Sequence, residues 1–239
     1  MDRYTRHKLK SDKFSETVVS SSHWAAENRG KLIGVAVIVA VAVLAVSGFS
    51  YHQNNRQHEA NDQLAKAFVT MEAPLQNSTP PVPAGEESYA TESDRSAAAF
   101  KAFSAVADGY PHTDAGHNAL YMAGVTAAQM KDNDKAEKLL TQASDGGNKD
   151  VSSLAKLALA NLYHSMNRDS DAIKQLEELR QHPTNAVPAT LSALQLGSIY
   201  EKTDPEKAKQ IYGELQKNDK DEEGKKIAMD RMSNLSSQK

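Results

Sequence analysis

Residues 159–183 read LANLYHSMNRDSDAIKQLEELRQHP, and this stretch decides the fold. Its apolar residues recur at every third or fourth position, the spacing that places side chains on one face of an α-helix. The polar run from Asn167 to Asp169 interrupts the pattern, and Pro183 ends it because proline cannot continue a helix. The stretch therefore predicts two helices of similar length joined by a tight turn.

The same design recurs along the chain. A small residue that lets two helices approach stands at four places, 37, 36 and 36 residues apart: Ala99, Ala136, Ala172 and Ala208. Four positions after each comes a large apolar residue: Phe103, Leu140, Leu176 and Tyr212. Upstream, Leu159-Ala160-x-x-Tyr163 is matched by Leu196-Gly197-x-x-Tyr200 and, more weakly, by Ala123-Gly124-x-x-Ala127. A near-constant period in four registers indicates a repeat architecture.

These motifs resemble the tetratricopeptide repeat, in which L-G-x-x-Y on one helix precedes A-x-x-x-F on the next. The tryptophan position of that pattern holds Leu120, Lys156 and Ala193 instead. The predicted fold is all-α, with a tetratricopeptide-like α-solenoid of helical hairpins over residues 92–239. A capping helix at 222–235 is expected to turn Ile227 and Leu235 inward. The alternative is a set of unrelated amphipathic helices whose period is coincidental.

Residues 32–51 are predicted to form a transmembrane helix ahead of the repeats. The run from Leu32 to Val46 is apolar apart from Gly34, and the segment of about twenty residues spans a hydrocarbon core of roughly 30 Å. Trp24 and Tyr51 bracket it, where interfacial aromatic residues belong. Two alternatives remain: a signal peptide cleaved near Ser47, and a buried core helix.

The charges around this segment predict its orientation. Seven basic residues lie in the predicted leader, residues 1–31: Arg3, Arg6, Lys8, Lys10, Lys13, Arg29 and Lys31. The twenty residues after the span carry only Arg56 and Lys66. The positive-inside rule then places the amino terminus in the cytoplasm. We expect a single-pass protein of a bacterial inner membrane with a periplasmic carboxyl-terminal domain.

Two further segments separate the span from the repeats. Residues 52–73 are predicted to form a juxtamembrane helix, because Leu64, Phe68 and Met71 share one helical face. Residues 74–91 contain Pro74, Pro80, Pro81 and Pro83, and we expect them to form a flexible insertion.

Catalytic chemistry has little support in this sequence. The chain has no cysteine, which excludes thiol chemistry and Cys-ligated metals. His58-Glu59 resembles the start of a zinc-binding helix, but Asp62 replaces the second histidine of that motif. No glycine-rich phosphate loop is present, and the net charge of −3 gives no general attraction to nucleic acid. We expect no enzyme activity, metal, cofactor, nucleic acid or small-molecule substrate.

Binding of proteins is better supported. Placing the first helix of each hairpin as in the resembled repeat family predicts a protein-binding groove lined by ten residues: Asn118, Tyr121, Val125, Leu154, Leu157, Asn161, His164, Leu191, Leu194 and Ser198. Its apolar members suit apolar client segments. The alternative is that Leu154 and Leu191 pack between repeats. Capture of a carboxyl terminus is not expected, because Asn118 and Asn161 have no basic companions in this set.

The membrane segment and its flanks resemble one bacterial family, the ancillary subunit of the SecYEG translocon. The residues that carry the resemblance are Trp24-Ala25-Ala26-Glu27-Asn28-Arg29-Gly30-Lys31, the span to Gly48, and Tyr51-His52-Gln53. The resemblance implies a chaperone-like helper that binds exported proteins and translocon or periplasmic chaperone subunits. The basic leader and the proline-rich insertion depart from the family pattern. The alternative is a signalling or envelope-assembly adaptor whose leader binds a regulator.

Overall fold

The structure is a computed structural model that describes residues 28–78, 81–218 and 221–237. The contacts divide the chain into two units, Met1–Asn55 and Arg56–Lys239. Most of the predicted basic leader and the interfacial Trp24 lie outside the described residues.

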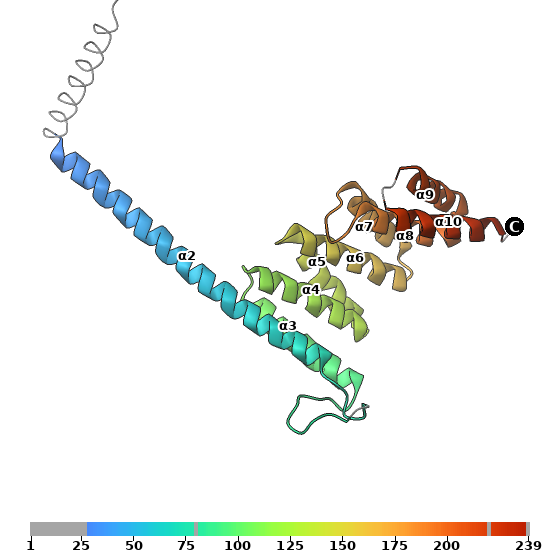
Figure 1. The fold of residues 1–239 in the computed structure, drawn as a ribbon, viewed down its shortest axis with the longest axis horizontal. Coiled ribbons are helices and arrows are strands. Elements are labelled where there is room, and N and C mark those ends of the chain that lie inside the picture. Colours follow the sequence, from blue (N-terminus) through green and yellow to red (C-terminus); the bar gives the residue numbers. More distant parts are fainter. Residues whose placement is uncertain (1–27, 79–80, 219–220, 238–239) are drawn as a thin grey trace, which may run out of the picture. The chain divides into compact units, whose positions relative to one another are not determined.

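The described residues form helices connected by short turns, with one isolated bridge and no longer strand. The helices are α2 (Arg29–Glu72), α3 (Glu92–Gly109), α4 (Asp114–Gln129), α5 (Asn133–Asp145), α6 (Lys149–Ser165), α7 (Asp169–Gln181), α8 (Ala189–Thr203), α9 (Pro205–Asn218) and α10 (Glu222–Ser237). From α3 onward each helix packs against the next, so the hairpins stack in chain order (Figure 1). The predicted all-α solenoid is confirmed.

Polar side chains set where the helices of the stack begin. Thr91 accepts a hydrogen bond from the Asp94 backbone N–H at 3.1 Å, which caps α3. Thr113 caps α4 in the same way, with 3.0 Å to the Gly116 N–H. Such caps satisfy backbone donors that have no partner inside the helix. Side chains also cap α5 and α6, whereas α7 and α8 begin at Arg168 and Pro188 without a side-chain cap.

The tight turns after α4 and α6 share one backbone feature. Lys131 and Asn167 both adopt left-handed conformations, with φ of 61° and 58°. A single left-handed residue ends a helix and reverses the chain within a few residues. These turns keep α4 in contact with α5, and α6 in contact with α7.

The repeated small and large residues meet between paired helices. Ala99, Ala136, Ala172 and Ala208 are fully buried, and so are the large residues four positions later. A Cβ on Gly124 would lie 2.7 Å from Leu140 Cγ, and a Cβ on Gly197 would lie 2.5 Å from Tyr212 Cε1. The first helix therefore needs a small residue where the second helix places a large one.

The core consists of two clusters that share the side chains of Phe100 and Leu139. The first joins the end of α2 to α3 and α4, and in it the rings of Phe68 and Phe103 meet edge to face at 5.2 Å. The second runs from α4 to α10. Each large side chain buried in this way contributes about 1.5–3 kcal/mol.

The capping helix α10 presents a different face from the one that we predicted. Leu235 packs partly against the core, as expected, but Ile227 is 40% exposed. Gly224 and Ala228 face the stack instead, and a Cβ on Gly224 would lie only 2.3 Å from Thr190 Cγ2. The close approach of α10 to α8 admits only small residues, so the bulky Ile227 lies on the solvent side.

In the proline-rich segment after α2, the described residues, 74–78 and 81–91, form no helix, and the base of the segment is closed. Leu75 and Tyr89 form a bridge, in which the Gln76 N–H donates to the Tyr89 carbonyl at 2.9 Å. The Tyr89 N–H donates in turn to the Pro74 carbonyl at 3.1 Å. The chain thus leaves and re-enters the stack at almost the same point.

The segment predicted to span the membrane and the predicted juxtamembrane helix are parts of one helix, α2. No proline interrupts the sequence between Lys31 and Glu72, so nothing ends the helix at Tyr51. One 18-residue window of α2 has a mean hydropathy of 2.8, and none of it is buried by other parts of the protein.

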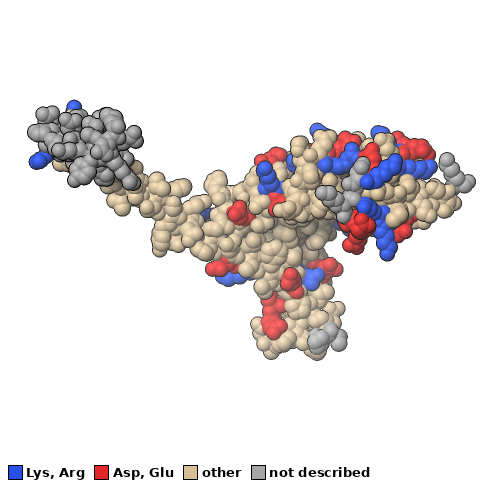
Figure 2. Space-filling view, turned by 45° about the horizontal axis from the view of Figure 1, so that its top comes forward, with Lys and Arg blue, Asp and Glu red and all other residues tan. Residues whose placement is uncertain are grey.

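The apolar part of α2 has no protein core around it. Ile38 and Leu44 are 70% and 72% exposed. No Asp, Glu, Lys or Arg occurs from residue 32 to residue 55, and this part of the helix is uniformly tan in Figure 2. The length and composition are those of a membrane anchor and equally those of a signal sequence. The core helix of a soluble domain has the same length and composition but is mostly buried, whereas this window is exposed.

Candidate protein-binding groove

The helices that follow α3 alternate between two positions in the stack. We call α4, α6 and α8 the first helices of their hairpins, and α5, α7 and α9 the second helices. The direct contacts that skip one helix, α4 with α6 and α8 with α10, involve no second helix. Of the three first helices, α4 and α6 meet in this way, and we predict that all three line the inner side of a curved stack.

The ten predicted groove residues all lie on first helices. Asn118, Tyr121 and Val125 are on α4; Leu154, Leu157, Asn161 and His164 are on α6; Leu191, Leu194 and Ser198 are on α8. Every one of them is exposed or half-buried, and none is fully buried. Their role in binding stays a prediction, because a position on the surface does not by itself identify a ligand.

The apolar members combine contact with the core and access to solvent. Tyr121, Val125, Leu154, Leu157 and Leu194 each pack partly against the core. This burial raises the pKa of the Tyr121 phenol above its usual range. Leu154 therefore supports the packing alternative in part, whereas Leu191 remains 36% exposed.

The first helices carry almost no charge on their exposed turns. No Asp, Glu, Lys or Arg occurs between Asp114 and Lys131, or between Lys156 and Arg168. The same holds from Gln181 to Tyr200. Charges of both signs are interspersed over the later helices of the stack (Figure 2). None of the ten predicted groove residues is an Asp, Glu, Lys or Arg, in a chain that is 25% charged.

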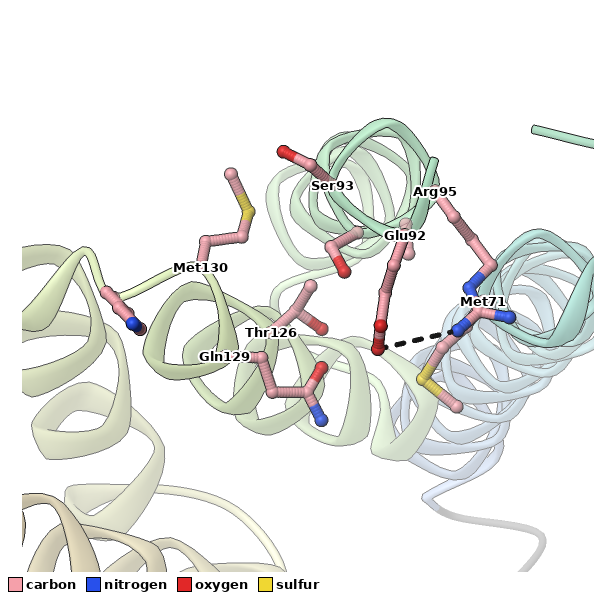
Figure 3. A pocket seen from close by; sticks show the side chains of 10 residues that line it. Met71, Glu92, Ser93, Arg95, Thr126, Gln129 and Met130 are labelled. Atoms are coloured by element: carbon pink, nitrogen blue, oxygen red, sulfur yellow. Dashed lines mark ion pairs between the residues drawn. The ribbon is translucent and has the colours of Figure 1, made fainter. Parts of the chain in front are cut away.

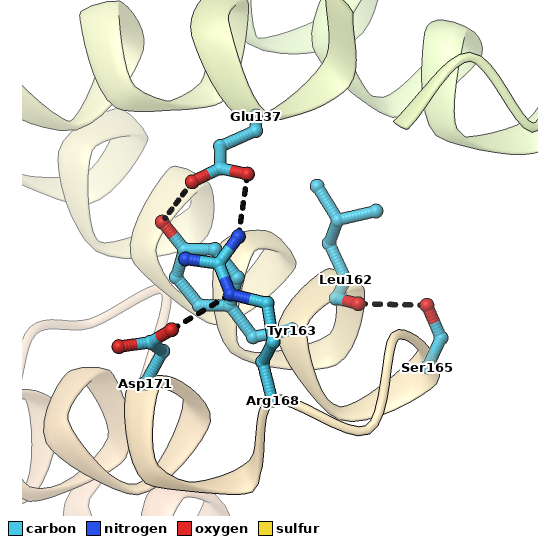
Figure 4. A network of polar contacts seen from close by, with 6 residues as sticks. All are labelled: Glu137, Leu162, Tyr163, Ser165, Arg168 and Asp171. Atoms are coloured by element: carbon cyan, nitrogen blue, oxygen red, sulfur yellow. Dashed lines mark hydrogen bonds and ion pairs between the residues drawn. The ribbon is translucent and has the colours of Figure 1, made fainter. Parts of the chain in front are cut away.

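A polar network fixes the angle between two neighbouring hairpins (Figure 4). Arg168 donates from Nη1 to Glu137 Oε2 at 2.7 Å and from Nε to Asp171 Oδ2 at 2.8 Å. The Tyr163 hydroxyl donates to the other oxygen of Glu137 at 3.1 Å, and the Arg168 guanidinium lies 4.3 Å from the Tyr163 ring centroid. Burial and the Glu137 carboxylate raise the pKa of Tyr163. The network ties α5 to α6 and α7, and so holds the shape of the groove.

A cavity of about 760 Å³ lies beside the groove, between the end of α2, the start of α3 and the end of α4 (Figure 3). Its lining is Met71, Glu92, Ser93, Arg95, Ser96, Ala99, Thr126, Gln129, Met130 and Lys131. Arg95 is held by the Ala73 carbonyl at 3.2 Å and by Glu92 at 3.8 Å. Gln129 stands one helical turn after Val125, so the cavity borders the groove on α4.

Sequence reasoning missed both the network and the cavity. Arg168 and Asp171 have the three-residue spacing of a helical ion pair, which is a readable signal. Glu137 is 31 residues from Arg168, and no local pattern joins them. Among the described residues, no group of three or more His, Asp or Glu is placed to hold a metal ion.

Comparison with protein families identifies the class of this chain. A tetratricopeptide repeat-like domain matches residues 22–189, and a tetratricopeptide repeat matches residues 192–221. The first match covers most of the chain, so the protein belongs to the tetratricopeptide repeat-like family. Such repeats are scaffolds for protein–protein interaction and are typically not catalytic.

No curated protein and no solved structure matches the chain. The family matches confirm the tetratricopeptide part of the resemblance drawn from the sequence. They carry nothing specific to an ancillary translocon subunit, which remains a hypothesis about this chain.

Proposed function

We propose that the protein is a membrane-anchored scaffold with a chaperone-like role. Through the inner side of its stack it binds exported proteins, together with translocon or periplasmic chaperone subunits. The observation that carries the proposal is the set of predicted groove residues on α4, α6 and α8, which is partly apolar and contains no Asp, Glu, Lys or Arg. Second helices of the same repeats carry their charges outward, so the absence of charge is particular to the groove.

The apolar part of α2 supports the anchor. It is long enough to cross a bilayer, and its side chains are exposed. A tether confines the groove to a thin layer beside the membrane. This raises its effective concentration for segments that emerge there, so weak contacts suffice.

The basic leader supports an orientation with the repeats outside the cytoplasm, in the periplasm of a bacterium. Protease added only to the cytoplasmic side of inner-membrane vesicles should leave residues after Tyr51 intact. Digestion of the repeat domain from that side would contradict the proposed topology. Loss of the first 47 residues from the mature protein would instead identify a signal peptide.

Site-directed crosslinking tests the proposed partners. Because the chain has no cysteine, single cysteines at Asn161 and Ser198 place a photocrosslinker at exposed groove positions without background labelling. Glu177→Cys on α7 is a matched control, exposed but on a second helix. In native membranes the groove positions should capture translocon subunits, chaperones or exported proteins. Recovery of only cell-wall or division proteins, or equal capture from Glu177→Cys, would contradict the proposal.

A further inference from the structure

The later part of α2 and helix α3 form an antiparallel pair (Figure 1). Three contacts join them in order along both helices: Ala73 with Arg95, Phe68 with Phe103, and Arg56 with Gly109. The residue number falls along α2 as it rises along α3, so α3 runs back along α2. We call residues 109–113, between α3 and α4, the α3–α4 turn. This turn is the end of the pair that lies beside the earliest contacting residue of α2.

Two successive residues of α2 hold the α3–α4 turn. Arg56 Nη2 donates to the Gly109 carbonyl at 2.6 Å, and the guanidinium lies 5.6 Å from the centroid of the Tyr110 ring. Gln57 Oε1 accepts a hydrogen bond at 3.2 Å from the backbone N–H of Asp114, the first residue of α4. The last carbonyl of a helix and the first N–H of the next have no partners inside their own helices. The side chains of α2 therefore satisfy backbone groups on both sides of the turn.

This attachment lies close to the end of the predicted membrane segment. Arg56 follows Tyr51, the last residue of that segment, by five positions on one helix. Five helical residues rise about 7.5 Å, and a tilted helix gains less height than that. The headgroup layer on each side of the hydrocarbon core is about 5–7 Å thick. If the segment spans a bilayer, Arg56 is therefore at the depth where headgroups meet water.

The composition of the turn suits that depth. Residues 109–113 contain no Asp, Glu, Lys or Arg; Pro111 and His112 are exposed, and Tyr110 is half-buried. Tyrosine is enriched at the level of the headgroups because its ring is apolar and its hydroxyl is polar. An aspartate stands on either side of the turn, so attraction to anionic lipid does not bring it to the membrane. The short connection to the apolar segment does.

The opposite end of the same helix pair has the opposite character. Four acidic residues lie there, all exposed: Glu86, Glu87, Glu92 and Asp94. Carboxylates stay in water unless they are paired, because their desolvation is costly. The charges along this pair thus favour one end for the membrane and the other for the aqueous phase.

We infer that the α3–α4 turn lies in the headgroup layer of the membrane that holds the anchor. The partner of this surface is lipid, and the five residues from Tyr51 to Arg56 set its depth. Helix α4, which begins at Asp114, then starts at the membrane surface. The inference rests on the anchor of the proposed function and goes beyond it, because it names the part of the repeat domain that contacts lipid.

The test uses the full chain in nanodiscs of zwitterionic lipid, part of which carries a nitroxide on its headgroup. The nitroxide quenches a nearby dye, so quenching reports proximity to the headgroups. Because the chain has no cysteine, the dye is attached through His112→Cys in the turn or, as a control, through Ser93→Cys in the first turn of α3. Both positions are exposed, and Ser93 precedes Gly109 by about 24 Å of helix. The dye in the turn should be quenched severalfold more strongly.

A change in the length of the connection tests its role without altering the repeat domain. Seven polar helix-forming residues inserted after Gln53 add two helical turns, about 10 Å, and keep the rotational phase of α2. Quenching at His112→Cys should then fall severalfold, to the level of Ser93→Cys. The same seven residues inserted between residues 81 and 86 are the matched control and should change nothing. Circular dichroism and the thermal midpoint establish that each variant is folded.

The outcomes separate the inference from the anchor on which it rests. Equal quenching at the two dye positions, or none at either in protein that stays in the nanodisc, would overturn the inference and leave the anchor intact. So would unchanged quenching at His112→Cys after the insertion at Gln53. Protein that does not enter the nanodiscs would overturn the anchor itself and the inference with it.

Discussion

The first and second helices of each hairpin contribute residues of different size to the core that they share. Their solvent-facing surfaces differ even more, in charge. First helices contribute small residues such as Gly124 and Gly197, against which second helices place Leu140 and Tyr212. On the side away from the core, second helices carry charges of both signs. First helices carry amides, hydroxyls and half-buried apolar groups.

This difference separates the buried residues that stabilise the stack from the surface residues that are available to a partner. A surface that only meets water gains solubility from charge. The predicted groove positions of the first helices lack Asp, Glu, Lys and Arg in three successive hairpins, although a quarter of the chain is charged. The buried faces of both helices therefore stabilise the stack, and the binding surface that we propose lies on the groove side of the first helices.

The largest expected effect is on a buried face. Leu176, on α7, is 1% exposed, and Leu176→Ala should lower the free energy of unfolding by about 2–5 kcal/mol. The measurement is urea denaturation of the full chain in nanodiscs, followed by circular dichroism. Leu191→Ala is the matched change on an outer face and should cost less than about 1 kcal/mol. Equal costs would show that the outer face of α8 belongs to the core.

Adding one methyl group at either of two glycines, Gly197 on a first helix and Gly213 on a second helix, tests the same difference between the helices. Gly197→Ala on α8 forces the Tyr212 ring to move and should destabilise the protein by about 1–3 kcal/mol. Gly213→Ala on α9 meets nothing within 4 Å and should stabilise it by about 0.5–1 kcal/mol through helix propensity. Thermal unfolding of both variants gives the comparison. The same sign for both changes would contradict the close packing of α8 on α9.

A smaller effect is expected where two hairpins are joined. Tyr163→Phe removes the hydrogen bond to Glu137 and should cost about 0.5–1.5 kcal/mol. Tyr200 stands at the same position one repeat later, where Ile173 replaces Glu137. Tyr200→Phe should therefore cost less than Tyr163→Phe in the same denaturation assay. If it costs as much, the network does not hold the α5–α6 junction.

The smallest expected effect is a dependence on alkaline pH. Burial, followed by the hydrogen bond to Glu201, raises the pKa of Tyr212 above the ordinary value of 10.0. The unfolded chain then ionises first, so this stabilisation is complete below about pH 10 and is lost as the pH rises further. Urea midpoints between about pH 8 and pH 11 should fall less steeply in Tyr212→Phe than in the wild type. The half-buried Tyr121 and the buried Tyr163, whose pKa values are also raised, should leave a residual slope. Identical slopes would show that Tyr212 does not contribute.

The fold was predictable from the sequence because the residues that recur at a constant period are the buried ones. Ala99, Ala136, Ala172 and Ala208 have to be small for the hairpins to close, so the spacing that reveals the repeat is also its packing rule. The candidate groove residues follow from the same alignment, and the structure places all of them on first helices, but their role in binding stays a prediction. The exposure of each groove residue does not follow from it, because exposure depends on how neighbouring hairpins stack.

The features that sequence patterns did not predict depend on packing between residues far apart in the sequence. At α10 hydrophobicity favoured Ile227 for the inner face, but the short distance to Thr190 selected Gly224. The contact from Glu137 to Arg168 and the cavity beside α4 both join residues far apart in sequence. Local periodicity carries no signal for such pairs.

The closed base of the proline-rich segment affects how well this protein tolerates insertions. The hydrogen bonds among Pro74, Gln76 and Tyr89 hold the two ends of this segment together. The segment between them therefore adds length without shifting the register of α3 on α2. A reporter domain or affinity tag spliced between residues 81 and 86 should therefore leave the neighbouring hairpins undisturbed. Because the base of the segment is closed, residues 81–86 are a suitable position for a label that leaves both termini unchanged.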